Sequence, residues 1–317
     1  MFESIISLVS GFILLIWSAD EFTNNGAKIA NIFKISPLII GLLIFGFGTS
    51  APEMLVSGLA AYEGHPELGI GNAFGSNIFN IALVLGITAI ILPIKVKQDI
   101  LKKEWLYLMA STLVAGILIW DGHLSFVDGL ILLSLLALFL IYTFFASKNG
   151  DHQEFNNLGA DDVKQGQRGK VWLMLAISFV VLLVSAKLVV WGGSELAASF
   201  GVSDLLIGLT VVALGTSLPE LAVSIGSALK KQHEMVVGNI IGSNLFNTVG
   251  VLAIPSLILP FDVPVDVINR DYPFMVALTV ILFIVSYKFK KEGVISRLEG
   301  VLLLVVLAIY LYLLLWT

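Results

Sequence analysis

The glutamates that end two nearly identical hexapeptides, GTSAPE and GTSLPE, stand within long apolar segments. These residues, Glu53 and Glu220, follow Thr49 and Thr216 by four positions, so each pair shares one face of a helix. Ionised carboxylates are costly at membrane depth, where they usually serve a function. Two such carboxylates neutralise one divalent cation or balance two monovalent ones. The repeated hexapeptide therefore predicts a pair of cation ligands.

A second pair of motifs supplies neutral oxygen atoms. The decapeptides GNAFGSNIFN and GNIIGSNLFN each end with a serine and an asparagine four residues apart, Ser76 with Asn80 and Ser243 with Asn247. Each pair again lies on one helical face. Such residues also link membrane helices by hydrogen bonds, and that alternative stays open for each of them singly.

Each hexapeptide also carries a proline, Pro52 or Pro219, which has no N–H for the carbonyl group four residues back. A carbonyl freed in this way is tolerated at membrane depth only where it lines a protein cavity, and there it can bind a cation. The decapeptides contain G-x-x-x-G spacings, which let helices approach closely. These spacings predict close packing at Gly71 with Gly75 and at Gly238 with Gly242.

The available ligands are almost all hard oxygen atoms. The chain has no cysteine, and its histidines fall in expected connections, at His65, His123, His152 and His233. Oxygen ligands with two carboxylates favour Ca²⁺ or Na⁺ over zinc or copper. One such site would bind Ca²⁺ and Na⁺ in competition. No basic patch with interleaved aromatic residues occurs, so nucleic acid is not expected as a partner.

The elements that must position these residues are membrane helices. Of 317 residues 57% are hydrophobic and only 13% are charged, and the mean hydropathy is +0.96. The apolar runs reach the roughly 20 residues that a helix needs to cross a bilayer, and they are too long for the strands of a barrel. We therefore predict an all-α membrane protein in the lipid bilayer, with ten transmembrane helices at 3–19, 37–61, 68–92, 104–120, 125–146, 170–191, 204–229, 234–259, 271–288 and 298–316.

Lysine and arginine are distributed unevenly over the expected connections. Of the 18 such residues, Arg270 falls on one side of the membrane, Lys187 falls inside a span, and all others fall on the opposite side. By the positive-inside rule, the richer side is cytoplasmic. Both termini are then expected outside the cytoplasm and the polar linker 147–169 inside. The acidic residues of this linker lack the spacing of a calcium-binding loop.

The chain contains an internal repeat. A shift of 167 residues aligns 36–93 with 203–260, and 27 of these 58 positions are identical. The repeat divides the chain into two five-helix halves, 1–146 and 170–317, joined by the linker. Since five is odd, the halves cross the membrane in opposite directions. Inverted repeats are typical of secondary transporters, which bind their substrates at the repeat interface.

Two further charges occupy equivalent places in the repeat, Asp20 at the end of the first span and Lys187 within the sixth. One interpretation is that they pair with each other or act as a gate. The structural alternative is a terminal aspartate and a lysine whose side chain reaches the membrane surface.

The paired hexapeptides and decapeptides resemble the α-repeats of the cation/calcium exchanger superfamily, in particular its prokaryotic sodium/calcium exchanger family. The resemblance extends over the ten spans, the inverted halves and the central linker. It implies an antiporter of the inner cell membrane that exports Ca²⁺ in exchange for Na⁺ by alternating access. It also implies that no cofactor takes part, and that the first and sixth spans slide across the other eight.

The resemblance further assigns roles to individual residues. The Ca²⁺ site would consist of two carboxylates and two backbone carbonyl groups, those of Glu53, Glu220, Thr49 and Thr216. The Na⁺ sites would be lined by four hydroxyl and two backbone carbonyl groups, those of Ser50, Ser76, Ser217, Ser243, Gly46 and Ala213. Two amides, Asn80 and Asn247, would line the centre.

One position departs from the family pattern. Many prokaryotic relatives carry aspartate where this chain has Asn247, and potassium-dependent branches carry carboxylates at both central positions. Two amides argue against K⁺ co-transport and leave Na⁺ and H⁺ open as the coupling ion. The alternatives are a Ca²⁺/H⁺ antiporter of the same superfamily, an intramembrane hydrolase that uses both carboxylates as acid and base, and a passive cation channel. We expect a transporter, not an enzyme.

Overall fold

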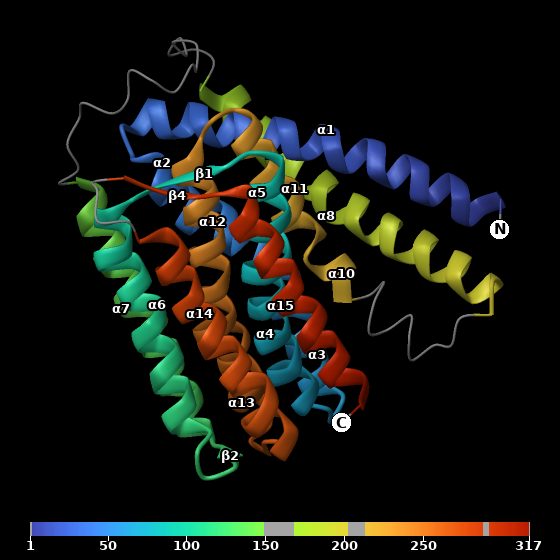
Figure 1. Cartoon of the computed structure of the whole chain (residues 1–317), viewed down its shortest axis with the longest axis vertical. Coiled ribbons are helices and arrows are strands. Elements are labelled where there is room, and N and C mark those ends of the chain that lie inside the picture. Colours follow the sequence, from blue (N-terminus) through green and yellow to red (C-terminus); the bar gives the residue numbers. More distant parts are fainter. Residues whose placement is uncertain (1, 149–167, 202–212, 288–291, 317) are drawn as a thin grey trace.

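The computed structural model describes residues 2–148, 168–201, 213–287 and 292–316. Within these ranges the chain is almost entirely helical (Figure 1). The helices are α1 (Phe2–Phe33), α2 (Pro37–Ile39), α3 (Gly46–Tyr62), α4 (Glu67–Phe79), α5 (Gly86–Ile91), α6 (Gln98–Leu118), α7 (Phe126–Lys148), α8 (Arg168–Ser199), α10 (Ala213–Thr216), α11 (Leu218–Leu229), α12 (His233–Leu245), α13 (Ala253–Ile258), α14 (Tyr272–Ser286) and α15 (Arg297–Trp316). Wider, π-helical turns form η1 (Ile40–Phe45), η2 (Asn80–Leu85), η6 (Phe246–Val251) and η7 (Val267–Asp271).

Several expected spans consist of consecutive helices. The second, third and eighth run through Pro37–Tyr62, Glu67–Ile91 and His233–Ile258, each with a π-helical segment inside. In the described part of the chain, eight helices are long and apolar enough to cross a membrane, and α11 is a shorter apolar helix. The fourth expected span corresponds to α6, which has 21 residues. The seventh, 204–229, is described only in α10 and α11.

The first and sixth spans are longer than the predicted 3–19 and 170–191. The corresponding helices, α1 and α8, have 32 residues each. At 1.5 Å per residue each is about 48 Å long, well above the roughly 30 Å of a bilayer core. They lie side by side and slanted across one end of the bundle (Figure 1). The first span does not end near Asp20, because α1 continues as one helix to Phe33, and within it the side chains of Thr23 and Asn25 donate to backbone carbonyl groups one turn back.

The inverted repeat is visible in the backbone. α5 and α13 are related by the shift of 167 residues, and so are the residues of positive φ, Lys34 with Gly201 and Gly64 with Lys231. Two antiparallel strand pairs, which the sequence pattern does not predict, lie at opposite ends of the bundle (Figure 1). They are β1 (Ile94–Lys97) with β4 (Glu292–Ile295), and β2 (His123–Leu124) with β3 (Phe261–Asp262).

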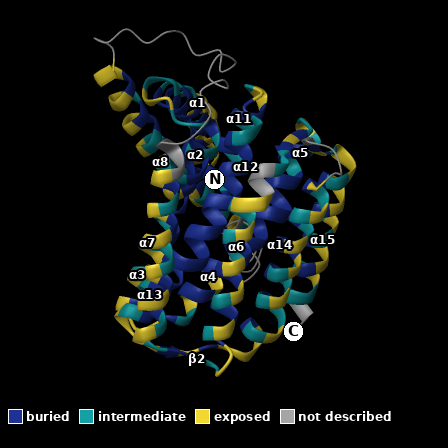
Figure 2. Ribbon diagram, turned by 90° about the vertical axis from the view of Figure 1, so that its left-hand side faces the viewer, coloured by how far each residue is buried: buried dark blue, intermediate teal, exposed yellow. Residues whose placement is uncertain are grey.

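The helices that carry the motifs form the centre of the bundle. The most apolar window of His233–Ile258 has a mean hydropathy of only 1.5, yet 89% of it is buried. The corresponding window of Phe126–Phe145 has a mean hydropathy of 2.2, and 22% of it is buried. Figure 2 shows the same contrast between buried α4 and α12 and the exposed faces of α7 and α15. The span that carries the second decapeptide is therefore surrounded by protein, where polar side chains are tolerated.

Candidate cation site

Glu53 and Glu220 lie in the interior of the bundle, on α3 and α11. Each residue is 1% exposed, and none of their carboxylate oxygens has a hydrogen-bond partner in the described part of the chain. The two carboxylates are close enough for the charge of Glu53 to act on Glu220. Buried polar atoms normally have partners, and a buried charge normally has a counter-charge. The two side chains therefore form a site suited to a cation.

Two asparagines occupy the segments that pack against these glutamates. Asn80 begins η2, which contacts α11, and Asn247 lies at the start of η6, which contacts α3. Both residues are 0% exposed, and no described residue bonds to the oxygen or nitrogen of either side-chain amide. Each glutamate helix thus packs against the asparagine segment of the other half. The amide oxygens of Asn80 and Asn247 are therefore candidates for two neutral ligands beside the carboxylates.

A cluster of hydroxyl groups also joins the two halves. Oγ of Ser243, on α12, lies 3.1 Å from Oγ1 of Thr49 and donates to the carbonyl oxygen of Gly46 at 3.5 Å. Ser50 donates to the backbone carbonyl of Ser243 at 3.5 Å. Thr49 also lies near Glu220. Four residues predicted for the site, separated by almost 200 positions, therefore meet at the repeat interface.

The hydroxyl groups of Ser76 and Ser217, which the repeat relates to those of Ser243 and Ser50, make fewer contacts between the halves. Ser76 donates to Oδ1 of Asn72 at 3.4 Å, and the hydroxyl of Ser217 is buried with no partner among the described residues. Thr216 lines a cavity beside α8, and Ala213 is the first residue of α10. The predicted role of Ser76 and Ser217 in lining a Na⁺ site therefore stays a prediction.

The two prolines affect their helices differently. Pro52 lies inside the continuous helix α3, where its missing N–H leaves the carbonyl of Gly48 without its usual intrahelical bond. Pro219 lies in the first turn of α11, directly after the chain departs from helical geometry at Ser217. Only Pro52 thus frees a backbone oxygen inside its helix, whereas Pro219 lies where a helix needs no N–H donor.

Close helix packing is present at one of the two G-x-x-x-G spacings. A Cβ atom on Gly238 would lie 2.5 Å from the carbonyl oxygen of Leu38, and one on Gly242 would lie 2.4 Å from that of Leu42. The prediction is therefore confirmed for this pair. At Gly71 and Gly75 no atom of the described chain lies within 4 Å of such a Cβ. The residues equivalent to Leu38 and Leu42 are Leu205 and Leu209, which lie outside the described ranges, so close packing there stays a prediction.

Two further asparagines position the glutamate-bearing helices. Asn72 and Asn239 each donate to the backbone carbonyl of the glutamate in their own half, at 3.2 Å and 3.3 Å. Each also donates at 3.0 Å to a hydroxyl group one turn further on, that of Ser57 or Ser224. Both asparagines and both serines are identical between the two copies of the repeat. Sequence patterns did not single out these four residues, and their identity between the two copies is the signal that could have found them.

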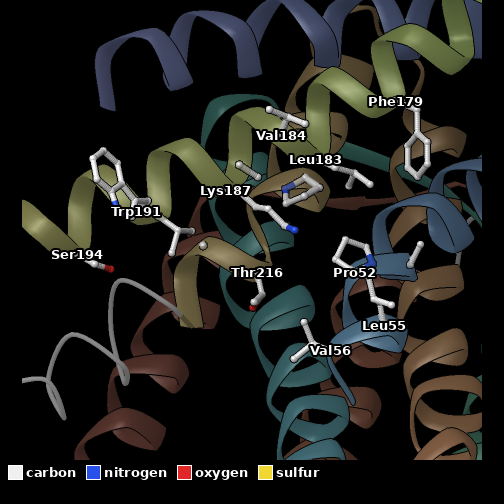
Figure 3. Close-up of a pocket in the computed structure, with 15 residues that line it drawn as sticks. Pro52, Leu55, Val56, Phe179, Leu183, Val184, Lys187, Trp191, Ser194 and Thr216 are labelled. Atoms are coloured by element: carbon white, nitrogen blue, oxygen red, sulfur yellow. The ribbon is translucent and has the colours of Figure 1, made fainter. Parts of the chain in front are cut away.

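Asp20 and Lys187 do not pair with each other in this structure, so the pairing interpretation is wrong, while a role in gating stays a prediction. Oδ1 of Asp20 lies 2.9 Å from Nζ of Lys230, at the end of α11. Lys187 points from α8 toward Pro52 and Thr216, into a cavity of about 580 Å³ (Figure 3). The two charges lie on neighbouring helices, α1 and α8, and face different neighbours.

The ligand set fits hard cations. Among the described residues, no three histidine, aspartate or glutamate side chains gather. The site instead offers two carboxylates with amide, hydroxyl and backbone oxygens, which suit Ca²⁺ and Na⁺ rather than softer transition metals.

Comparisons with known proteins agree with this chemistry. The family model described as sodium/calcium exchanger protein matches residues 3–145 and 170–316. The inner membrane protein YrbG of Escherichia coli is 35% identical over 98% of this chain and 96% of its own. The sodium/calcium exchanger MaX1 of Methanosarcina acetivorans is 29% identical over 95% of this chain and 97% of its own. A solved structure of the sodium-calcium exchanger NCX_Mj, soaked with zero Na⁺ and Ca²⁺, has a TM-score of 0.83 at 35% identity and covers 97% of both chains.

These matches extend over both halves of the chain. They confirm the predicted fold, an all-α membrane protein with ten transmembrane helices in two inverted repeats. The similar proteins are transporters, so the alternative of an intramembrane hydrolase is excluded. The chain belongs to the sodium/calcium exchanger family, a family of cation antiporters.

Proposed function

We propose that the protein exports Ca²⁺ in exchange for Na⁺ by alternating access, without transporting K⁺. The observation that carries this proposal is the pair of buried carboxylates, Glu53 and Glu220, which opposite halves supply and which no described residue hydrogen-bonds. Their combined charge balances either one Ca²⁺ or two Na⁺. The site is neutral when it holds one Ca²⁺ or two Na⁺, but it would be positively charged if it held all three ions. This charge balance favours exchange of Ca²⁺ for Na⁺ over co-transport of the two.

The proposed Ca²⁺ and Na⁺ sites use different kinds of ligand. Ca²⁺ binds the two carboxylates with the backbone carbonyls of Thr49 and Thr216. Na⁺ binds at sites lined by the hydroxyls of the motif serines and the carbonyls near Gly46 and Ala213. The serines are Ser50, Ser76, Ser217 and Ser243. The cluster of Ser243 with Thr49, Ser50 and Gly46 supports this division, because it gathers weak neutral ligands beside Glu220.

The absence of K⁺ transport rests on the central amides. A further monovalent cation would need additional negative charge, and Asn80 and Asn247 are neutral. No other acidic residue lies among the buried residues of α3, α4, α11, α12, η2 or η6. The site charge therefore comes from the two glutamates.

We also propose the orientation and the domain limits. Both termini lie outside the cytoplasm, the linker 147–169 lies inside, and the halves comprise 1–146 and 170–317. The uneven distribution of lysine and arginine supports this orientation.

Flux into reconstituted vesicles tests the proposal. Vesicles loaded with Na⁺ and diluted into Na⁺-free medium are expected to accumulate radiolabelled Ca²⁺, because outward Na⁺ flow drives Ca²⁺ inward. An ionophore that dissipates the Na⁺ gradient should abolish uptake, and a protonophore should leave it intact. The rate should be the same in K⁺ and choline media.

Other outcomes identify the alternatives. Uptake abolished by the protonophore but not by the Na⁺ ionophore would show a Ca²⁺/H⁺ antiporter. Ca²⁺ uptake that needs no counter-ion would show a channel. Uptake that requires K⁺ would overturn the proposed K⁺ independence.

A further inference from the structure

At two positions, the two copies of the repeat carry residues of opposite charge. A shift of 167 residues places Asp20 on Lys187 and Glu63 on Lys230. The ion pair of Asp20 with Lys230 therefore has a symmetry-related counterpart, Lys187 with Glu63. Because the sign is reversed at both positions, the counterpart is also an attractive pair.

The first pair is formed in this structure. Nζ of Lys230 contacts Oδ1 of Asp20 at 2.9 Å and donates to the backbone carbonyl of Asp20 and to Oγ1 of Thr23, both at 2.5 Å. Burial lowers the pKa of Lys230, and the acidic groups of Asp20 and Glu21 oppose that shift. The pair ties the middle of α1 to the end of α11. It thus holds one long slanted helix against a helix that carries a site glutamate.

The counterpart is open in this structure. Glu63 caps the end of α3 and is exposed, and neither it nor Lys187 has an ion pair within the described ranges. Lys187 instead lines the cavity between α8 and α3, beside Pro52 and Val56 (Figure 3). Glu63 lies seven residues beyond Val56, which is about 10 Å along α3 at helical rise. Lys187 therefore reaches Glu63 only if α8 shifts relative to α3 by several ångströms.

We propose that Lys187 and Glu63 form the second of two alternating ion pairs, which closes when the Asp20–Lys230 pair opens. The inference rests on the proposed alternating access. In an inverted-repeat transporter, the second state arises when the two halves exchange conformations. The contact that α1 now makes with α11 is then made by α8 with α3. Since Lys230 and Glu63 belong to connections predicted on opposite sides of the membrane, each pair closes one side.

Cysteine cross-linking tests this inference without a transport assay. The natural chain has no cysteine, so introduced thiols report only on the chosen positions. One variant carries Asp20→Cys with Lys230→Cys, the second carries Lys187→Cys with Glu63→Cys, and a third carries all four changes. A bifunctional thiol reagent with a spacer about as long as a lysine side chain is applied to the protein in vesicles. Cross-links are counted by mass spectrometry in variants that elute as monodisperse protein.

Both pairs are expected to cross-link, because the protein visits both states. In the variant with four changes, each molecule should carry one cross-link or the other. Molecules that carry both would overturn the inference. So would cross-linking of the first pair without any of the second. Two matched controls use the charged neighbours Lys231 and Glu67 in place of Lys230 and Glu63, and these should cross-link much less.

Charge reversal supplies a functional test. Lys187→Glu and Glu63→Lys should each slow Ca²⁺ exchange by roughly two- to fivefold, the size typical of an accessible ion pair. The double variant, which restores attraction, should recover the natural rate, and Glu67→Lys should not change it. A double variant as slow as the product of the single effects would overturn the proposed pair.

The two kinds of failure are distinguishable. If the natural protein exchanges Ca²⁺ for Na⁺ but the second pair never cross-links, the inference fails alone. If the cross-links alternate but the protein carries other ions, the proposed function fails and the inference stands.

Discussion

The charge of the cation site resides in two side chains, because the other polar groups around it are neutral. Glu53 and Glu220 are each 1% exposed, and burying an ionised carboxylate without a partner is costly. A bound Ca²⁺ or a pair of Na⁺ removes that cost. In the proposed function, the residues that destabilise the ion-free protein are thus the residues that bind the ions.

Removing one charge should therefore stop transport without unfolding the protein. Glu53→Gln or Glu220→Gln keeps the size of the side chain but leaves half of the site charge, so radiolabelled Ca²⁺ uptake should fall to the level of empty vesicles. Glu67→Gln, a partly exposed glutamate at the start of α4, is the control and should transport normally. Normal Ca²⁺ exchange by either site variant, at equal protein yield, would contradict the assignment.

Asn72 and Asn239 should contribute equally to the stability of the protein and to Ca²⁺ binding. Asn72→Ala and Asn239→Ala each remove two hydrogen bonds, and loss of buried bonds costs on the order of 1–3 kcal/mol. We expect a lower melting temperature and weaker Ca²⁺ binding in both variants, measured by thermal unfolding with and without Ca²⁺. An effect on one variant only would contradict their equivalence.

A third carboxylate should make Ca²⁺ transport depend more strongly on pH. Asn247→Asp places an ionisable group beside two others, and like charges that are close together disfavour ionisation. We expect Ca²⁺ transport to persist and to become more dependent on pH. Flux at several pH values, compared with the natural protein, measures this. A pH profile that coincides with that of the natural protein would contradict a central position for Asn247.

For single helices, the sequence patterns predicted that a membrane span exists more reliably than they predicted where the helix ends. Apolar runs located the spans, but α1 continues thirteen residues beyond Asp20 to Phe33. The partner of Asp20 is Lys230, more than 200 positions away. Local composition carries no information about such a partner. Sequence patterns also did not predict the π-helical turns η1, η2 and η6.

Close packing of α12 against the second span can be tested with one methyl group. A Cβ on Gly242 would lie 2.4 Å from the carbonyl oxygen of Leu42, so Gly242→Ala should destabilise the protein by about 1–3 kcal/mol. At Gly169, in the first turn of α8, no described atom lies within 4 Å of such a Cβ. Gly169→Ala is therefore the control and should be neutral or slightly stabilising in thermal unfolding. Equal melting temperatures for the two variants would contradict the close approach.

For the whole molecule, the internal repeat was the most informative feature of the sequence. It predicted the inverted halves, and the residues of positive φ follow the same shift of 167 residues, at Lys34 with Gly201 and Gly64 with Lys231. It also pointed to the paired glutamates. It did not predict the cluster of Ser243 with Thr49 and Gly46, because contacts between the halves depend on how the repeats pack together. The alternating ion pairs likewise follow only once the partner of Asp20 is known.

Equilibrium Ca²⁺ binding to the purified protein tests the central claim, that one site shared by the two halves serves Ca²⁺ and Na⁺ in turn. We expect one Ca²⁺ per chain, displaced by Na⁺ and not by K⁺, and no binding after Glu53→Gln or Glu220→Gln. Ca²⁺ binding that Na⁺ does not displace, or that survives the loss of both carboxylates, would contradict the account.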